Sequence, residues 1–229
     1  MGETRAIRTR DGGSMSAYVA KPAAAGPAVV VIQEIFGVNK VMRDVTDGLA
    51  GQGFLAICPD LFWRIEPGVE ITDQTEAEWK KAFSLMNAFD VDNGVEDIAA
   101  TIDAIRPEGG GKVGTVGFCL GGQLAFLSAT RTDSDASVGY YGVGIENRLG
   151  EAGNIKRPLM LHIAEEDGFV PKAAQAKIIA GLKDNPLVTV HTYPGRDHAF
   201  ARIGGEHYDA ADAAKAGERS LAFFRQHLG

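Results

Sequence analysis

Apolar runs bounded by turn residues alternate along the chain with stretches of helical period. Several runs, such as AVVVIQ (28–33) and PLMLHIA (158–164), are continuous rather than alternating. This pattern is typical of strands that are buried on both faces of a largely parallel sheet. The runs predict strands over Ser16 to Lys21, Ala28 to Gln33, Phe54 to Pro59, Lys112 to Phe118, Ala136 to Tyr141, Leu159 to Ala164 and Leu187 to Tyr193.

The stretches between these runs carry helical patterns. In NGVEDIAATIDAIRPEG (93–109), apolar residues recur at steps of three and four and form one stripe before Pro107 and Gly109 end the helix. Leu221, Phe224 and Leu228 give the last helix the same kind of stripe. Alternating strands and helices predict right-handed crossovers and an open α/β sheet with helices on both faces.

The segment from Phe62 to Asp92 is the longest stretch without a clear strand. It contains TEAEWKKAFSLMNAFD (75–90), which predicts a helix with Trp79, Phe83 and Met86 on one face. Such an excursion in an open α/β fold often covers the active-site edge of the sheet. A plain surface helix with an apolar underside is the alternative interpretation.

Cys119 stands between a predicted strand, KVGTVGF (112–118), and a predicted helix that begins at Leu120. The pattern Gly117-x-Cys119-x-Gly121 corresponds to the G-x-S-x-G elbow, in which glycines let strand and helix pack closely around a strained turn that exposes the nucleophile. The helix N-terminus also favours thiolate over thiol. We therefore interpret Cys119 as a nucleophile, whereas Cys58, in LAICPDL (55–61), is interpreted as a buried, inert thiol.

A nucleophile of this kind needs a base and a group that orients the base. His198 follows a strand and a glycine-containing loop, so it is the expected base, whereas His162, inside an apolar strand, is interpreted as a core residue. Asp167 lies in a loop directly after a strand and is the expected acid. The order nucleophile, acid, histidine is that of α/β-hydrolases. The competing acids are Glu165, Glu166 and Asp197.

Acyl transfer also needs hydrogen-bond donors for the developing oxyanion. The residue after the nucleophile supplies one backbone N–H, which is that of Leu120. The strand-to-helix loop in VVVIQEIFGVN (29–39) offers a second donor at the N–H of Ile35. These two groups form the predicted oxyanion hole.

Length, composition and charge narrow the class of protein. The 229 residues fit one ordinary domain, which we expect to span residues 1–229. A net charge of -7 argues against a nucleic-acid partner. No apolar run is long enough to span a membrane and no signal-type region follows the start, so we expect a cytoplasmic protein without a membrane partner. Two cysteines exclude a disulfide framework.

With these elements placed, the sequence resembles the dienelactone hydrolase family. The matching stretches are QEIFGVN (33–39), CPDLF (58–62), VGFCLGGQLAF (116–126), GYYGVGIE (139–146) and DHAFAR (197–202). The resemblance implies an α/β-hydrolase fold, a triad of Cys119, Asp167 and His198, and no metal or cofactor. It also implies that Glu34 contacts the resting thiol and helps to deprotonate it. Without the resemblance, we would interpret Glu34 as pairing with a nearby arginine.

The family opens an unsaturated lactone during the breakdown of aromatic compounds, and its substrates carry a carboxylate that two arginines typically receive. Arg202 matches one of them, with a surface ion-pairing role as the alternative. The other is expected on the helix after Thr75, where this chain has Trp79. Ala199 also stands where a serine could bind the substrate. The residues expected to make the pocket more hydrophobic are Phe36, Trp79, Phe83, Met86 and Tyr141.

Three functional hypotheses follow. The first is a cofactor-free cysteine hydrolase that opens a lactone or activated ester, with a small molecule as its partner and a monomer favoured over an oligomer. The second is a broader carboxylesterase or thioesterase for hydrophobic activated esters, which Trp79 favours. The third is a non-catalytic ligand-binding or redox-sensing protein with Cys119 as an oxidisable thiol, although neither role requires the acid and the histidine.

Overall fold

The strands of the computed structural model, which describes residues 2–229, form one sheet in the order β1-β2-β4-β3-β5-β6-β7-β8. The strands from β4 to β8 in that order pair in parallel, whereas β2 pairs with β1 and β4 in antiparallel fashion. The strands are β1 (Glu3–Arg8), β2 (Ser14–Ala20), β3 (Ala28–Ile32), β4 (Leu55–Pro59), β5 (Val113–Phe118), β6 (Ala136–Tyr140), β7 (Leu159–Ala164) and β8 (Val188–Tyr193).

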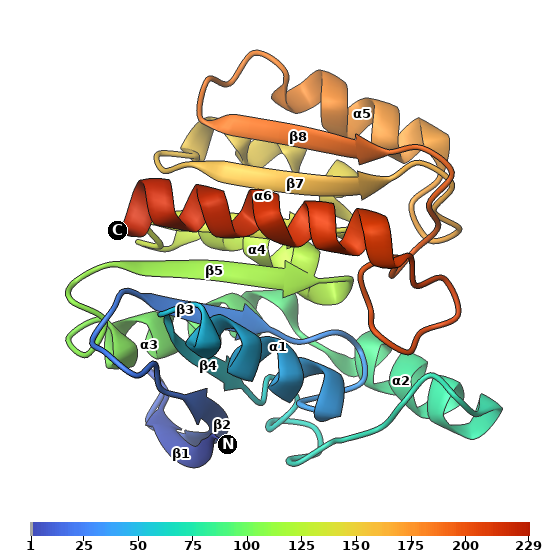
Figure 1. Ribbon diagram of the computed structural model, residues 1–229. Helices are drawn as coiled ribbons and strands as arrows, with labels where there is room; N and C mark the ends of the chain where they lie inside the picture. Colours follow the sequence, from blue (N-terminus) through green and yellow to red (C-terminus); the bar gives the residue numbers. More distant parts are fainter. Residues whose placement is uncertain (1) are drawn as a thin grey trace.

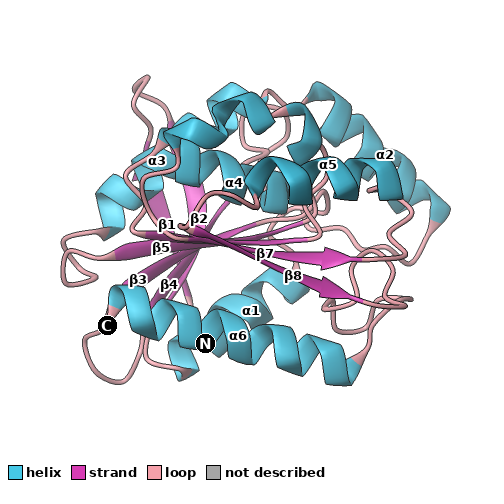
Figure 2. Ribbon diagram, turned by 90° about the horizontal axis from the view of Figure 1, so that it is seen from above, coloured by secondary structure: helices cyan, strands magenta, loops and turns pink. Residues whose placement is uncertain are grey.

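Helices cover both faces of this sheet, as the sequence predicts. Figure 2 shows α1 and α6 on one face and α2, α3, α4 and α5 on the other. The helices are α1 (Lys40–Gly51), α2 (Glu76–Ala88), α3 (Val91–Ile105), α4 (Leu120–Arg131), α5 (Lys172–Leu182) and α6 (Ala210–Leu228), with two short 3₁₀ segments over Ile145–Asn147 and Leu149–Asn154.

The sequence missed one strand. The predicted strands all occur, with ends that differ by at most two residues, but β1 (Glu3–Arg8) was not expected. This edge strand pairs only with β2 and deeply buries one side chain, that of Ile7. Because its other residues face solvent or are half-buried, it has no apolar run to mark it.

The parallel strands run toward the end of the sheet where α2 and the loop 194–209 lie (Figure 1). Thr75 caps the start of α2: its hydroxyl accepts from the backbone N–H of Glu78 and donates to the Glu78 carboxylate. Ala82 and Leu85 are the residues that α2 buries in the core. On the neighbouring face of the helix, Trp79 and Met86 are partly buried against the core and Phe83 is exposed.

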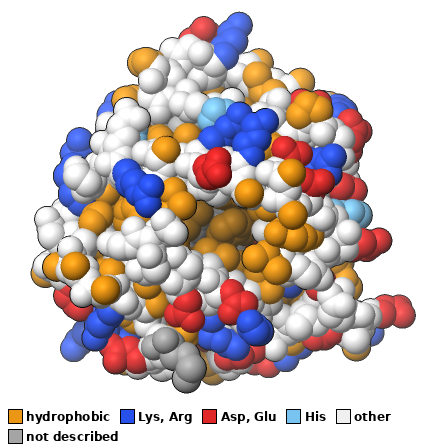
Figure 3. Space-filling model, viewed as in Figure 1, with side chains coloured by type: hydrophobic (Ala, Val, Ile, Leu, Met, Phe, Trp, Pro, Cys, Tyr) orange, Lys and Arg blue, Asp and Glu red, His pale blue; other side chains and the backbone are white. Residues whose placement is uncertain are grey.

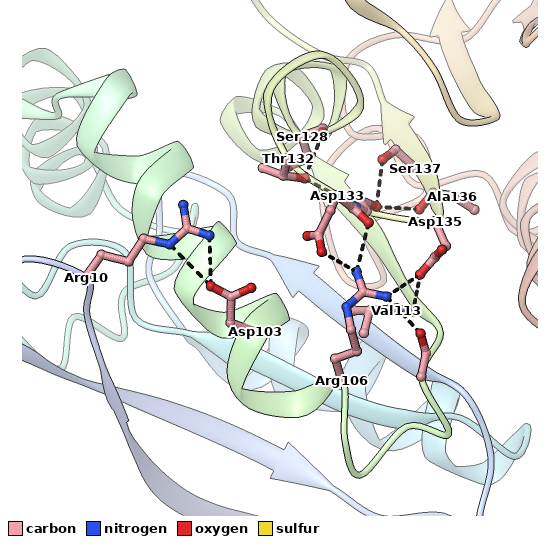
Figure 4. A network of polar contacts seen from close by, with 12 residues as sticks. Arg10, Asp103, Arg106, Val113, Ser128, Thr132, Asp133, Asp135, Ala136 and Ser137 are labelled. Atoms are coloured by element: carbon pink, nitrogen blue, oxygen red, sulfur yellow. Dashed lines mark hydrogen bonds and ion pairs between the residues drawn. The ribbon is translucent and has the colours of Figure 1, made fainter.

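Ion pairs fix the opposite, amino end of the sheet (Figure 4). Arg106 donates to Asp135 at 2.6 Å and lies 3.1 Å from an Asp133 carboxylate oxygen. Asp135 also accepts from the backbone N–H of Val113, the first residue of β5, at 2.9 Å. Arg106 therefore joins the end of α3 to the starts of β5 and β6.

The face covered by α1 and α6 is hollowed between these helices (Figure 3). The hollow is a cavity of about 240 Å³ with Phe118 and Tyr140 of the sheet among its walls. It lies on the side of β5 away from α4 and is separate from the cavity that contains Cys119. Within residues 2–229, the helices are all too short or too polar to cross a membrane.

Candidate active site

Cys119 occupies the tight turn between β5 and α4. Its backbone φ of 58° lies in the left-handed region, which is rare for a residue other than glycine. A Cβ atom on Gly117 would lie 1.9 Å from the carbonyl oxygen of Gly121, and one on Gly121 would lie 2.4 Å from that of Ile32. The two glycines are thus required by close backbone contacts, as the elbow pattern predicts.

Asp167 and His198 come together from two loops at the carboxyl end of the sheet. The Nδ1 atom of His198 lies 2.9 Å and 3.0 Å from the two carboxylate oxygens of Asp167. Asp167 also accepts from the backbone N–H groups of Phe169 and Val170. Asp197 holds the loops together, because its carboxylate accepts from the N–H groups of Gly168 and His198.

The other candidate acids and histidines have different partners. Glu166 pairs with Lys172 on the surface, and Asp197 contacts the backbone of His198 rather than its ring. His162 is buried in the core, where its ring nitrogens lie 2.7 Å from the Tyr193 hydroxyl and 3.0 Å from that of Ser220. Its interpretation as a core histidine is confirmed.

The ring of His198 favours the protonated form. Burial opposes this form, but the charge of Cys119, together with the hydrogen bonds that the ring donates to Asp167 and Cys119, raises the pKa of His198 to about 10. The protonated imidazole places a positive charge next to the sulfur of Cys119. By contrast, burial raises the pKa of Cys58 far above its usual range, so this thiol stays neutral in β4.

Backbone strain is concentrated around the cysteine. Of the residues other than glycine in 2–229, those with positive φ are Cys119, Tyr141 and Ala199, at 58°, 38° and 62°. Cys119 and Tyr141 directly follow β5 and β6, and Ala199 follows His198. Strained conformations of this kind persist where the surroundings enforce them and are typical of functional sites.

Tyr141 was expected in the pocket wall, but it lies behind the histidine. Its ring is 5.0 Å from that of His198 and 5.7 Å from that of Phe200, and its side chain is buried. It does not line the cavity that contains Cys119. The positive φ turns the chain at Tyr141 so that its ring packs against the imidazole ring of His198.

Within residues 2–229, the two predicted oxyanion donors are backbone N–H groups without a partner inside a helix or strand. Leu120 is the first residue of α4, and its N–H therefore has no partner within the helix. The backbone N–H of Ile35 donates no hydrogen bond to any group in the described part of the chain. Both N–H groups are thus available, and Ile35 lines the cavity together with Cys119.

Glu34 pairs with Arg202, which corresponds to the alternative interpretation of this carboxylate. The two side chains form a buried ion pair through Nη1 of Arg202 and Oε2 of Glu34. Burial raises the pKa of Glu34, although Arg202 and His198 oppose the shift. Arg202 is not the surface residue of its own alternative interpretation, since only 3% of its side chain is exposed.

A cavity of about 610 Å³ surrounds these groups. Phe36, Trp79, Phe83, Met86 and Ala199 line it as expected, which makes α2 a wall of the candidate site rather than a plain surface helix. Several further lining residues were not predicted, among them Asp73 and Phe169. Asp73 and Phe169 lie in polar loops, TDQTE (72–76) and EEDGFVP (165–171), whose sequences indicate only exposed turns.

The chain was compared with known protein families. The model of the dienelactone hydrolase family matches residues 15–228, which is nearly the whole chain. The chain belongs to the dienelactone hydrolase family. Family membership makes it a hydrolase that acts on lactone or ester bonds.

Relatives within the dienelactone hydrolase family cover the chain almost completely. The carboxymethylenebutenolidase of Pseudomonas putida is 44% identical over 95% of this chain and 93% of its own. A protein of Azospirillum brasilense, whose name also refers to carboxymethylenebutenolidase, is 55% identical over 97% of this chain and 98% of its own. A solved structure from Klebsiella pneumoniae, whose title refers to dienelactone hydrolase, has a TM-score of 0.86 at 28% identity and covers 99% of this chain.

Proposed function

We propose that this member of the dienelactone hydrolase family opens a lactone or activated ester through a thioester on Cys119. The observation that carries the proposal is the position of Cys119 on a strained turn, in one cavity with a histidine that Asp167 holds. A nucleophile, a base and a group that orients the base are the parts that covalent acyl transfer needs. A non-catalytic sensing thiol would not need them.

In the first half of the reaction, the Cys119 thiolate attacks the carbonyl carbon and a sulfur–carbon bond forms. The oxyanion accepts hydrogen bonds from the N–H groups of Leu120 and Ile35. The carbon–oxygen bond of the ester then breaks, and the leaving oxygen takes the proton from His198. In the second half, water gives a proton to His198 and adds to the thioester, and expulsion of the thiolate releases the carboxylic acid.

The use of sulfur limits the leaving group. A tetrahedral intermediate on Cys119 can expel either the thiolate or the oxygen of the substrate, and the less basic group leaves more readily. An alkoxide is more basic than a thiolate, so an ordinary alkyl ester mostly reverts. An enolate or a phenolate competes successfully, which favours enol lactones and activated esters.

Glu34 would act on the thiol before the attack. Its carboxyl group is buried, and burial raises its pKa, which makes the carboxylate a stronger proton acceptor. Glu34 therefore accepts the Cys119 proton when a substrate enters the cavity. The names of the relatives support dienelactone as the first substrate to test, and with it a role in the breakdown of aromatic compounds.

The test is steady-state hydrolysis of cis- and trans-dienelactone beside neutral p-nitrophenyl acetate, with Cys119→Ala in parallel. We expect turnover of at least one substrate by the wild type, a covalent acyl adduct that mass spectrometry detects after rapid quenching, and neither turnover nor adduct in Cys119→Ala. Equal turnover by wild type and Cys119→Ala would sink the proposal.

A broader esterase for hydrophobic activated esters is the second candidate. One observation favours it: the aromatic side chains of Trp79, Phe83 and Phe169 gather at the cavity, where the family resemblance leads one to expect a second arginine. The same substrate panel separates the two candidates, because this one predicts turnover of the neutral ester only.

A further inference from the structure

The cavity around Cys119 is rich in carboxylates. Glu34, Asp73 and Glu206 line it, whereas Arg202 is the single lysine or arginine among its walls in residues 2–229. His198 is already paired with Asp167. A substrate carboxylate that enters this cavity therefore meets more negative than positive charge.

Arg202 is engaged on two edges. Its Nη1 atom pairs with Glu34, and its Nε atom lies 3.3 Å from Oδ2 of Asp73. The face of its guanidinium group lies 4.4 Å from the centroid of the Phe36 ring. A substrate carboxylate can bind Arg202 only by displacing Glu34 or Asp73, or by becoming a third anion around one cation. The cost of desolvation and the repulsion between like charges oppose both arrangements.

Asp73 is held in place by the aromatic helix next to it. The indole Nε1–H of Trp79 donates to the backbone carbonyl of Asp73 at 2.9 Å. The hydroxyl and backbone N–H of Thr72 both donate to Glu78 at 2.8 Å. These contacts tie the turn that carries Asp73 to the first turn of α2, so the carboxylate is fixed beside Arg202.

Three aromatic rings form an open wall beside this charge cluster. The ring of Trp79 is stacked with that of Phe83 at 5.5 Å and with that of Phe169 at 6.4 Å. Phe169 also lies edge-on to His198 at 4.8 Å. Phe83 and Phe169 remain 39% and 46% exposed, so apolar area next to the reacting groups is left uncovered by the chain itself.

From these contacts we propose that Asp73 excludes carboxylate-bearing lactones, and that Trp79, Phe83 and Phe169 bind an aryl group, so that the preferred substrate is an uncharged, aryl-bearing lactone or activated ester. This inference rests on the proposed function, because it names the substrate class of the same site. A neutral aryl group gains contact with three rings and leaves both ion pairs of Arg202 intact.

The charge rule is tested with two lactones that differ only in charge: dienelactone and the same methylene lactone without its carboxylate. The wild type is expected to prefer the neutral lactone by at least about tenfold in kcat/KM. In Asp73→Asn, whose amide oxygen can still accept from Arg202, this preference falls by about tenfold or more. Glu66→Gln removes the same charge from an exposed pair with Lys81 outside the cavity and should keep the wild-type preference.

Each result has one meaning. A wild type that prefers the anionic lactone, or a preference that Glu66→Gln changes as much as Asp73→Asn, overturns the role of Asp73 while Cys119-dependent hydrolysis stands. A wild type that hydrolyses neither lactone and no activated ester contradicts the proposed function itself. Circular dichroism and thermal unfolding of Asp73→Asn separate lost selectivity from lost folding.

The aryl wall is tested with vinyl phenylacetate and vinyl acetate, which share a leaving group and differ by one phenyl ring. In Phe83→Leu, KM for vinyl phenylacetate should rise by about three- to tenfold, with a much smaller change for vinyl acetate. Ile179→Ala removes a similarly exposed apolar side chain from α5, outside the cavity, and should leave KM unchanged for both esters. Equal changes for both esters in Phe83→Leu would overturn the aryl site.

Discussion

Two arginines at opposite ends of the sheet each pair with two carboxylates, yet they have different surroundings. Arg106, at the amino end, contacts Asp133 and Asp135 and also donates to two backbone carbonyls, with 24% of its side chain exposed. Arg202, at the carboxyl end, contacts Glu34 and Asp73 with 3% exposed and lies over an aromatic ring.

The difference lies in what surrounds the charges. Around Arg106, the chain uses hydrogen bonds to main-chain groups to join α3 to β5 and β6. Arg202 instead lines a cavity, and its side chain contacts carboxylates rather than main-chain groups. The three strained residues Cys119, Tyr141 and Ala199 lie nearby. The same kinds of side chain therefore join elements of the fold at one end and line the candidate active site at the other.

The largest effect is expected from Cys119→Ala at the reactive end. Loss of the nucleophile should lower kcat/KM by about 10⁴-fold or more, while the free energy of unfolding stays within about 1 kcal/mol of wild type. Steady-state kinetics and urea unfolding measure both. The matched control is Cys58→Ala in β4, for which we expect retained activity and a loss of about 1–3 kcal/mol in stability.

Asp167→Asn should have the next largest effect. The amide keeps the shape of the side chain but no longer stabilises the protonated ring of His198, so kcat/KM should fall by about 10³-fold. Asp197→Asn is the comparison, because Asp197 contacts the backbone of His198 rather than its ring. Equal losses in the two variants would contradict the assignment of Asp167 as the orienting acid.

Replacing each arginine by methionine tests the comparison directly. Arg202→Met leaves the buried carboxylate of Glu34 and the partly buried carboxylate of Asp73 without their cation, and we expect a loss of about 3–5 kcal/mol in unfolding free energy together with most of the activity. Arg106→Met, at a partly exposed site, should cost about 1–3 kcal/mol and leave kcat/KM within about twofold of wild type. Urea unfolding and kinetics of a neutral ester provide the measurements. A large loss of activity in Arg106→Met would show that the two ends are coupled.

The last expected effect is a dependence of stability on pH. Because the folded state raises the pKa of His198 above its ordinary value of 6.5, the protonated ring stabilises the fold below that pH. This contribution is lost as the pH rises through about 10. The unfolding free energy of wild type relative to His198→Gln should therefore decrease between these pH values. Cys119→Ala, which removes one cause of the shift, should weaken the trend, and a difference that is flat with pH would contradict it.

The sequence predicted the parts of this molecule that depend on local pattern. Continuous apolar runs identified the buried strands, and the glycines around Cys119 identified the elbow, because backbone contacts there leave no space for a Cβ atom. His198 and Asp167 followed from their places after successive strands, since the carboxyl ends of parallel strands meet at one edge.

What the sequence left out depends on contacts between distant segments. Asp73 is 129 positions from Arg202, and its polar loop looks like an ordinary exposed turn until folding brings it beside the arginine. The position of Phe169 in the cavity wall and the burial of the Arg202 side chain also depend on contacts between distant segments, so the sequence did not predict them. Tyr141 was expected in the pocket because sequence gives no sign of a positive φ, which places its ring behind His198.

The turn that carries Asp73 and the helix that carries Trp79 and Phe83 form one continuous stretch of chain, whereas Cys119, Asp167 and His198 stand on three separate strand ends. A single exchange of the coding sequence for residues 72–88 would thus replace Asp73, which we propose excludes anionic substrates, together with most of the aromatic wall. The reacting groups would be inherited unchanged. Descendants of one ancestral gene could in this way acquire new substrates while retaining the same chemistry.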